Sequence, residues 1–198
     1  MVDYRFFTQL FWAGFNIFAS VIIFISNGGI FFYKFNQNSN KFRKDFRNFI
    51  KQEIQRLIGR SLRQAVNLKY LKGKTINIDC DVIQADGGTR TAAITGGCVA
   101  LFLAINKHHD DKRAIKSYVA AVSLGVKDNN VLLDLDYSED SSADTDLNIV
   151  MNDKDELIEI QGTAEDAPFS KKELDDMLVM GSSAIADIIK KQKAKCVN

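Results

Sequence analysis

The sequence predicts a mixed fold, either α+β or an α/β sandwich, on three observations. Apolar and polar residues alternate from Thr75 to Val82, which is the period of a half-buried strand. The apolar run from Ala92 to Ile105 is typical of a buried helix, and further strands and a final helix follow it. Strands mixed with two or three helices in 198 residues favour one layered domain, with room for an appendage.

The first 50 residues differ in composition from the rest of the chain. Phe6 to Tyr33 contains no charged residue and is long enough to span a bilayer, although polar residues and Gly28-Gly29 interrupt it. Three interpretations stay open: a membrane anchor, a part of the fold, or foreign sequence joined to a broken gene. The abundance of Phe, Ile, Asn and Lys, which AT-rich codons encode, favours the third. The basic stretch Lys41 to Lys51 offers charge that could bind RNA.

The remaining elements follow in order from their local patterns. Each has either helical spacing of apolar residues or the alternation of a strand. Asp128-Asn129-Asn130 is typical of a hairpin turn, and Ser170 with Glu173 forms a capping box that opens the last helix. The expected elements are a helix over Glu53 to Asn67, strands over Ser117 to Val126, Val131 to Tyr137, Leu147 to Met151 and Leu157 to Gln161, and a helix to about Gln192.

Charge is balanced overall but unevenly distributed. Lys and Arg number 26 and Asp and Glu 25. Basic residues concentrate between Lys34 and Arg63, and acidic residues between Asp134 and Glu156. Such a division suits a protein that binds a polyanion in one place and a metal in another, although two solvated faces explain it equally well. The three cysteines lack metal spacing, which favours core thiols in a reducing compartment and a cytoplasmic location.

The first candidate site is the turn Gly87-Gly88-Thr89-Arg90, between the strand that begins at Thr75 and the buried helix. The glycines allow a sharp turn, and the start of a helix presents free N–H groups to an anion. An Arg at that place can bind two phosphate oxygens. The alternative is a plain turn, since the motif is neither a Walker A loop nor a GxGxxG.

The second candidate site is the acidic loop that contains Asp140, Asp144 and Asp146. Carboxylates on a turn beside a strand suit a hard divalent cation such as Mg²⁺, which shares its other positions with water and substrate phosphates. An EF-hand is excluded, because its Gly and terminal Glu are not at the required positions. The alternative is an acidic surface loop.

Taken together, these motifs closely resemble the bacterial ribonuclease PH family from about Gln52 to the last helix. The resemblance implies a βαβ sandwich like ribosomal protein S5 domain 2, here incomplete at its amino end, in hexameric rings of three dimers. It also implies a phosphorolytic 3′-to-5′ exoribonuclease that trims tRNA precursors with inorganic phosphate. The matching stretches are Glu53 to Arg63, Ile78 to Ala92, Leu133 to Tyr137, Glu139 to Ser141, Ala143 to Asp146, Glu159 to Glu165 and Pro168 to Ser170.

By this resemblance, Gly88, Thr89 and Arg90 bind phosphate, and Asp140 and Asp146 are catalytic and hold Mg²⁺. Asp144 adds to the outer shell of the metal. The resemblance divides the chain into an atypical segment over residues 1–50 and a ribonuclease PH-like domain over 51–198.

The pattern departs from the family upstream of Glu53. The family's second phosphate-binding Arg falls on Ile50, and its amino-terminal strands and arginine-rich stretch have no counterpart in the sequence. The aliphatic side chain of Ile50 cannot replace a guanidinium at that place, and neighbouring Lys51 lacks the planar fork of an Arg. An inactive remnant, or a non-catalytic ring subunit of the same family, is therefore the alternative to an active enzyme.

Overall fold

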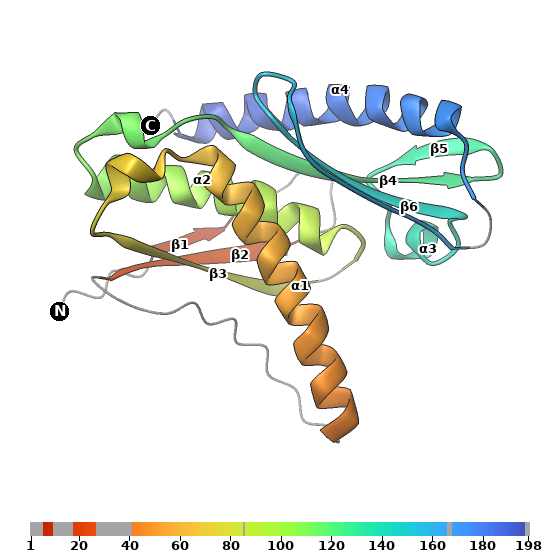
Figure 1. Ribbon diagram of the computed structural model, residues 1–198, viewed down its shortest axis with the longest axis horizontal. Helices are drawn as coiled ribbons and strands as arrows, with labels where there is room; N and C mark the ends of the chain where they lie inside the picture. The colour runs from red at the N-terminus through yellow and green to blue at the C-terminus, as the bar shows by residue number, and fades with distance from the viewer. Residues whose placement is uncertain (1–5, 10–17, 27–40, 85, 166–167, 197–198) are drawn as a thin grey trace.

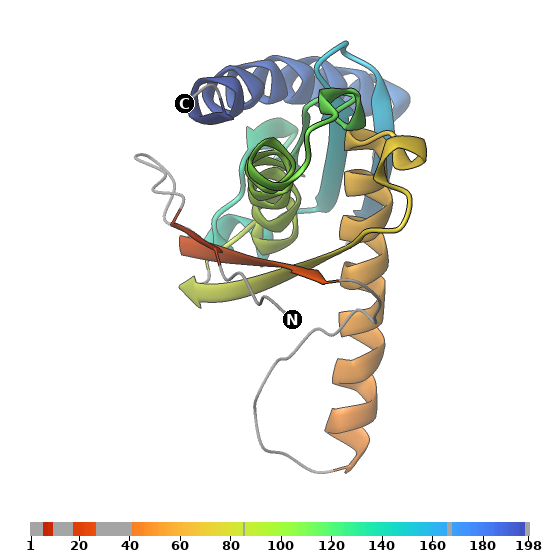
Figure 2. The same ribbon diagram turned by 90° about the vertical axis from the view of Figure 1, so that its left-hand side faces the viewer.

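The computed structural model describes residues 6–9, 18–26, 41–84, 86–165 and 168–196, which form two sheets and the helices between and around them (Figure 1). Helix α2 (Thr89–His108) lies between the sheets, in contact with β2 and β3 on one side and with β4 on the other. Helix α4 (Lys171–Cys196) packs on the far side of the second sheet, and Figure 2 shows α2 between α4 and the first sheet. The α+β sandwich expected from the sequence is confirmed.

The first sheet contains part of the atypical amino-terminal segment. Its strand order is β1 (Phe6–Gln9), β2 (Phe18–Ser26), β3 (Thr75–Gln84), and both pairings are antiparallel. The sequence of β2 is rich in β-branched and aromatic residues, which favour a strand. Of the three interpretations left open, these two strands support the second, a part of the fold. The rest of Phe6 to Tyr33, and the origin of the segment, lie outside what the structure describes.

Two helices contact each other between the sheets. Helix α1 (Lys41–Ala65) begins well before the expected start at Glu53 and ends close to the expected position. Its apolar stripe packs against α2, where Leu62 lies 3.0 Å from the position of a Cβ on Gly97. In the described chain, α2 alone is long and apolar enough to cross a membrane, and it is mostly buried inside the fold.

The second sheet has the strand order β5-β4-β6-β7, with every pairing antiparallel. The strands are β4 (Val119–Lys127), β5 (Asn130–Leu133), β6 (Thr145–Asn152) and β7 (Leu157–Ala164). The expected hairpin turn is confirmed, because Asp128 and Asn129 take φ of 51° and 60°, as a two-residue hairpin turn requires. Strand β5 ends at Leu133 rather than at Tyr137, since Asp134 turns left-handed with φ of 58° and a short helix, α3 (Tyr137–Asp140), follows.

Strand β4 is buried on both faces and contributes to two apolar cores. Val119 and Ala121 pack with α1 and α2, whereas Ala120 and Val122 pack with β6 and α4. Because side chains alternate along a strand, one strand can serve both layers. This continuous burial explains why the sequence of β4 lacks a polar face.

The carboxyl-terminal helix is fixed at both ends. Its expected capping box is confirmed: the backbone N–H of Glu173 donates to Ser170 Oγ, and that of Ser170 donates to the Glu173 carboxylate. Near the other end, Gln192 Nε2 donates to the backbone oxygens of Thr95 and Val119, at 2.9 Å each. Two short 3-10 helices, Leu68–Leu71 and Lys112–Ala114, complete the described elements.

Candidate functional site: an anion-binding loop beside an acidic segment

The loop between β3 and α2 is fitted against the segment that follows β5. A Cβ built on Gly87 would lie 1.7 Å from the backbone oxygen of Leu135, so only glycine fits there. The carboxylate of Asp86, the residue before Gly87, accepts a 2.8 Å hydrogen bond from the backbone N–H of Tyr137. The loop is therefore held from outside by backbone atoms of residues far away in the sequence.

Gly88 turns the chain into α2. It takes φ of 61°, in the left-handed region, and stands at the N-cap without a side chain to bond the first turn. Thr91 Oγ1 donates to the backbone oxygen of Gly88 at 2.8 Å. No acidic residue occupies the first turn of this 20-residue helix. Because the first N–H groups of a helix have no partner within it, they favour an anion at this place.

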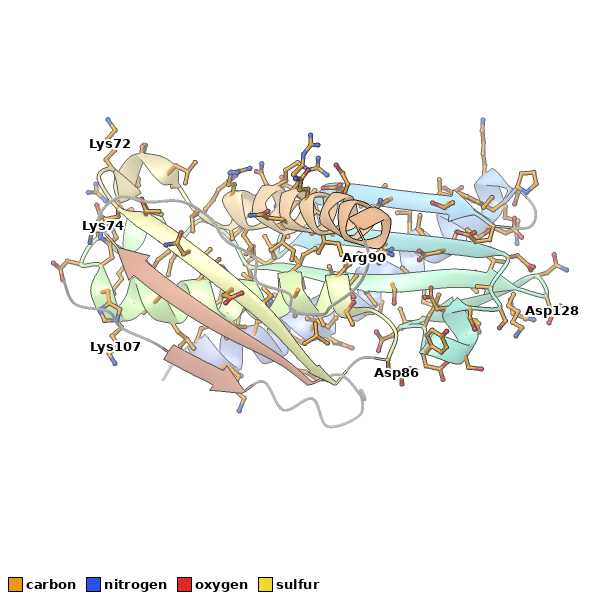
Figure 3. All side chains as sticks on the ribbon, turned by 90° about the horizontal axis from the view of Figure 1, so that it is seen from below. Lys72, Lys74, Asp86, Arg90, Lys107 and Asp128 are labelled. Atoms are coloured by element: carbon orange, nitrogen blue, oxygen red, sulfur yellow. The ribbon has the colours of Figure 1, made fainter. Side chains whose placement is uncertain are left out.

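Arg90 joins the loop to the acidic segment. Its Nη2 lies 3.4 Å from a carboxylate oxygen of Asp146 on β6. The side chain of Arg90 is 37% exposed and that of Asp146 is 22% exposed, so the guanidinium keeps a face open to solvent. In Figure 3, the labelled Arg90 and Asp86 lie in the same part of the molecule, away from Lys72, Lys74 and Lys107. The predicted phosphate and catalytic residues are thus neighbours in space.

Asp146 is also bonded by Asn148, whose Nδ2 lies 3.2 Å from its other carboxylate oxygen. The two residues are separated by one position on β6 and so share a face. Burial raises the pKa of Asp146, and this effect exceeds the opposing effect of Arg90; the nearby carboxylates of Asp140 and Glu165 raise it further. Asp146 therefore holds a proton more readily than an ordinary aspartate does.

Asp140 ends the short helix α3, which a local capping box stabilises. The Asp136 carboxylate accepts from the N–H of Glu139 at 2.8 Å, and the Glu139 carboxylate accepts from the N–H of Asp136 at 3.1 Å. Asp140 is exposed, and its charge acts on Asp146. The cap therefore fixes the backbone of Asp140 at a place from which its charge reaches Asp146.

Asp144 is bonded elsewhere. Its carboxylate accepts from the backbone N–H of Asp128, in the β4–β5 turn, at 3.3 Å. Among the described residues, no group of three or more acid, His or Cys side chains is arranged to hold a metal ion. The structure thus brings Asp140 and Asp146 together, but not all three predicted metal ligands as one set. A pair of carboxylates still suits Mg²⁺, which often takes one or two from the protein and the rest from water and phosphate.

Three residues of the site were not predicted. Asn148 could have been found, because it follows Asp146 by two positions in a predicted strand. Ser123 and Asp134 come from the β4–β5 hairpin and approach Gly88, where their side-chain oxygens lie 3.4 and 3.6 Å from the position of a Cβ. No local pattern in the sequence indicates that this hairpin passes behind the loop.

An α+β sandwich with a helix start that favours an anion beside acidic side chains is the arrangement expected of a protein that acts on phosphate groups. Family models identify the class more closely. Residues 30–105 match domain 1 of the 3′ exoribonuclease family, and residues 117–184 match its domain 2. The two matches cover most of the chain, which therefore belongs to the 3′ exoribonuclease family. The first match begins at residue 30, ahead of the boundary expected at residue 50.

Solved structures share the fold at low sequence identity. Rice (Oryza sativa) Rrp46 is similar with a TM-score of 0.73 at 16% identity, over 100% of this chain and 95% of that one. An archaeal exosome core is similar with a TM-score of 0.66 at 17% identity, over 90% and 78%. The Archaeoglobus fulgidus exosome with RNA bound to the active site is similar with a TM-score of 0.63 at 17% identity, over 88% and 81%.

Proposed function

We propose that the chain is a phosphorolytic 3′-to-5′ exoribonuclease that shortens RNA, including tRNA precursors, and releases nucleoside diphosphates. The observation that carries this proposal is the contact between Arg90, at the start of α2, and Asp146. This contact supports the proposal because, in a member of the 3′ exoribonuclease family, a helix start that favours an anion lies next to an acidic side chain. The buried cysteines of the described chain fit a reducing, cytoplasmic setting.

In the proposed reaction, the Gly88–Arg90 loop binds inorganic phosphate through N–H groups and the guanidinium. An oxygen of this phosphate attacks the last phosphodiester phosphorus of the RNA, and the bond from that phosphorus to the preceding 3′ oxygen breaks. The attacking hydrogen phosphate gives up its proton, and the leaving 3′ oxygen gains one.

Asp140 and Asp146 would hold Mg²⁺ together with substrate oxygens. When bound, the ion supplies positive charge beside the phosphate that is transferred. Arg90 supplies positive charge from the protein itself and orients the attacking group. Catalysis would rest on position and charge, without a covalent intermediate.

We also propose that the chain assembles with copies of itself into a ring of dimers, as the family resemblance implies. On the edge strand β7, Leu157 and Ile160 are 49% and 43% exposed, and Val179 on α4 is 74% exposed. An unpaired edge with exposed apolar side chains favours association. Analytical ultracentrifugation measures the number of subunits, and a monomer at all concentrations would contradict a ring.

A non-catalytic ring subunit is the second candidate function. The observation that favours it is Ile50, which stands in α1 at the place of the family's second phosphate-binding Arg. An aliphatic side chain cannot bind an anion, so phosphate would depend on Arg90 and the loop alone.

The test is a phosphorolysis assay on RNA with extra 3′ nucleotides, with Mg²⁺ and with or without phosphate. We expect phosphate-dependent release of nucleoside diphosphates that falls at least about a hundredfold in Asp146→Asn and about tenfold or more in Arg90→Lys. Asp128→Asn is the matched control, since Asp128 is an exposed acid in the β4–β5 turn, and it should keep full activity. Release of monophosphates without phosphate would contradict phosphorolysis. No release from folded protein would favour the non-catalytic subunit.

A further inference from the structure

Three side-chain oxygens surround one point behind the anion-binding loop. The position that a Cβ on Gly88 would occupy lies 3.2 Å from Thr91 Oγ1, 3.4 Å from Ser123 Oγ and 3.6 Å from Asp134 Oδ1. Thr91 belongs to α2 and is explained by its hydrogen bond to the Gly88 oxygen. Ser123 and Asp134 belong to a different layer, and nothing in the proposed reaction uses them.

Ser123 and Asp134 are cross-strand neighbours. The backbone N–H of Asp134 donates to the backbone oxygen of Ser123 at 2.7 Å, next to the pairing of Leu124 with Leu133. Ser123 is only 5% exposed, and within the described chain its Oγ is buried without a hydrogen-bond partner. A buried hydroxyl without a partner is costly, so a role beside the loop would explain its presence.

Asp134 places a carboxyl group where an ionised form is disfavoured. Burial, and to a lesser extent the Glu139 carboxylate on α3, raise the pKa of Asp134 to about 6. The other charged groups of the site are Asp86 in the loop, Arg90 on α2, and Asp146 on β6, which Arg90 contacts. Asp134 therefore changes charge within the pH range in which proteins work.

We propose that Asp134 is a positioning residue that sets the phosphate affinity of the Gly88–Arg90 loop through its own charge. This inference rests on the proposed phosphate site. Ionised Asp134 repels an anion bound at the loop in front of it, whereas neutral Asp134 does not. Phosphate binding and protonation of Asp134 then favour each other.

The sign of the pH dependence follows directly. Below about pH 6 Asp134 is mostly neutral, and the loop binds phosphate at its full strength. As the pH rises through about 6, Asp134 ionises and phosphate affinity falls. Replacing Asp134 by Asn keeps the shape and a left-handed backbone that Asn tolerates, but removes the charge.

The experiment measures binding of inorganic phosphate by calorimetry at pH 5, 6, 7 and 8 in wild type, Asp134→Asn and Asp128→Asn. Asp128 is a matched control, because it also has positive φ but is exposed in the turn, and Figure 3 shows it far from Arg90. Phosphate itself titrates in this range, so the affinity ratio of each variant to wild type is the readout. For Asp134→Asn we expect a ratio near one at pH 5 that rises on the order of tenfold by pH 8. For Asp128→Asn the ratio should stay near one.

A ratio for Asp134→Asn that does not change with pH would overturn this inference and leave the phosphate site intact. Failure of wild type and Asp128→Asn to bind phosphate at any pH would overturn the phosphate site, and this inference with it. A chain that binds phosphate without any role of Asp134 would give only the first result, a ratio for Asp134→Asn that stays constant with pH.

A second measurement keeps the test independent of whether Asp134→Asn folds. Carbon-13 NMR of the Asp134 carboxyl in wild type gives its pKa with and without saturating phosphate. We expect phosphate to raise this pKa by about one unit, since the same coupling acts in both directions. A pKa of Asp134 that does not change when phosphate is added would overturn the inference.

Discussion

The two halves of the candidate site, the Gly87–Arg90 loop and the Asp140–Asp146 segment, are in contact but are held in place by different means. The loop is held by close packing, with the Leu135 oxygen against Gly87. The start of the acidic segment is held mostly by hydrogen bonds within a short helix and turn, such as those between Asp136 and Glu139, and its end, Asp146, lies on β6. The loop therefore depends on the exact shape of distant segments, whereas the backbone around Asp140 depends on local bonds at the surface.

The two kinds of support predict which mutations each half is sensitive to. Adding atoms to the loop requires backbone movement in the segment after β5, which a packed interior resists. Removing a local bond in the acidic segment loses roughly the net worth of that bond, since water replaces the partner. Shape should therefore dominate mutational effects in the loop, and charge should dominate them in the acidic segment.

The largest effect is expected at Gly87. Gly87→Ala would bring a methyl group within 1.7 Å of the Leu135 oxygen, so the loop or the segment after β5 must move. We expect a loss of about 3 kcal/mol in the free energy of unfolding, together with loss of phosphate binding. Urea denaturation and calorimetry with phosphate measure the two quantities.

Gly59→Ala is the matched control for the same added methyl group. Its Cβ would meet only Arg63 Nη2, at 3.8 Å, in the interior of α1. We expect the free energy of unfolding to stay unchanged or to rise by up to about 1 kcal/mol, because Ala favours a helix over Gly. Equal losses in the two variants would refute the view that packing against Leu135 holds the loop.

A smaller effect is expected at the cap of α3. Asp136→Ala removes the acceptor for the Glu139 N–H and should cost about 1 kcal/mol in the free energy of unfolding. It should also weaken activity, because α3 positions Asp140. Asp136→Asn, which still accepts this bond, is the control in the same urea titration and assay. Unchanged stability in Asp136→Ala would show that the cap does not hold the acidic segment.

The smallest effect is expected at Ser142, in the same segment. Its hydroxyl donates to the Ser138 oxygen and accepts from Lys127 Nζ, both at 2.7 Å and both exposed. Ser142→Ala should change the free energy of unfolding by less than about 0.5 kcal/mol. Ser141→Ala, one position away, is the comparison, and a loss above about 1 kcal/mol in Ser142→Ala alone would break the pattern.

Most of the fold was accessible from local sequence patterns. The hairpin turn at Asp128-Asn129, the capping box at Ser170 and the buried helix all depend on neighbouring residues, and the structure confirms them. The end of β5 was misplaced, because the alternation of Val131 to Tyr137 continues past a left-handed turn at Asp134. A pattern of side chains does not record that change of backbone direction.

The site was predictable where one segment carries its own chemistry. Thr89 and Arg90 could be placed at a helix start because the glycines and the apolar run adjoin them. The support behind the loop, from Ser123 and Asp134, depends on which strand passes near Gly88, and that is a property of the tertiary fold. The different bonding of Asp144 likewise follows from the β4–β5 turn that its carboxylate meets.

The double burial of β4 has a consequence for how the chain can be divided. The family models separate it into two domains between residues 105 and 117, yet the core around α1 and α2 includes Val119, Ala121 and Val150 from the second. Cutting the chain at that boundary, or replacing one of the two domains, would remove the strand residues that pack against one side of α2. The two domains of the family models therefore share one core in this chain, and hydrogen exchange should show them opening together.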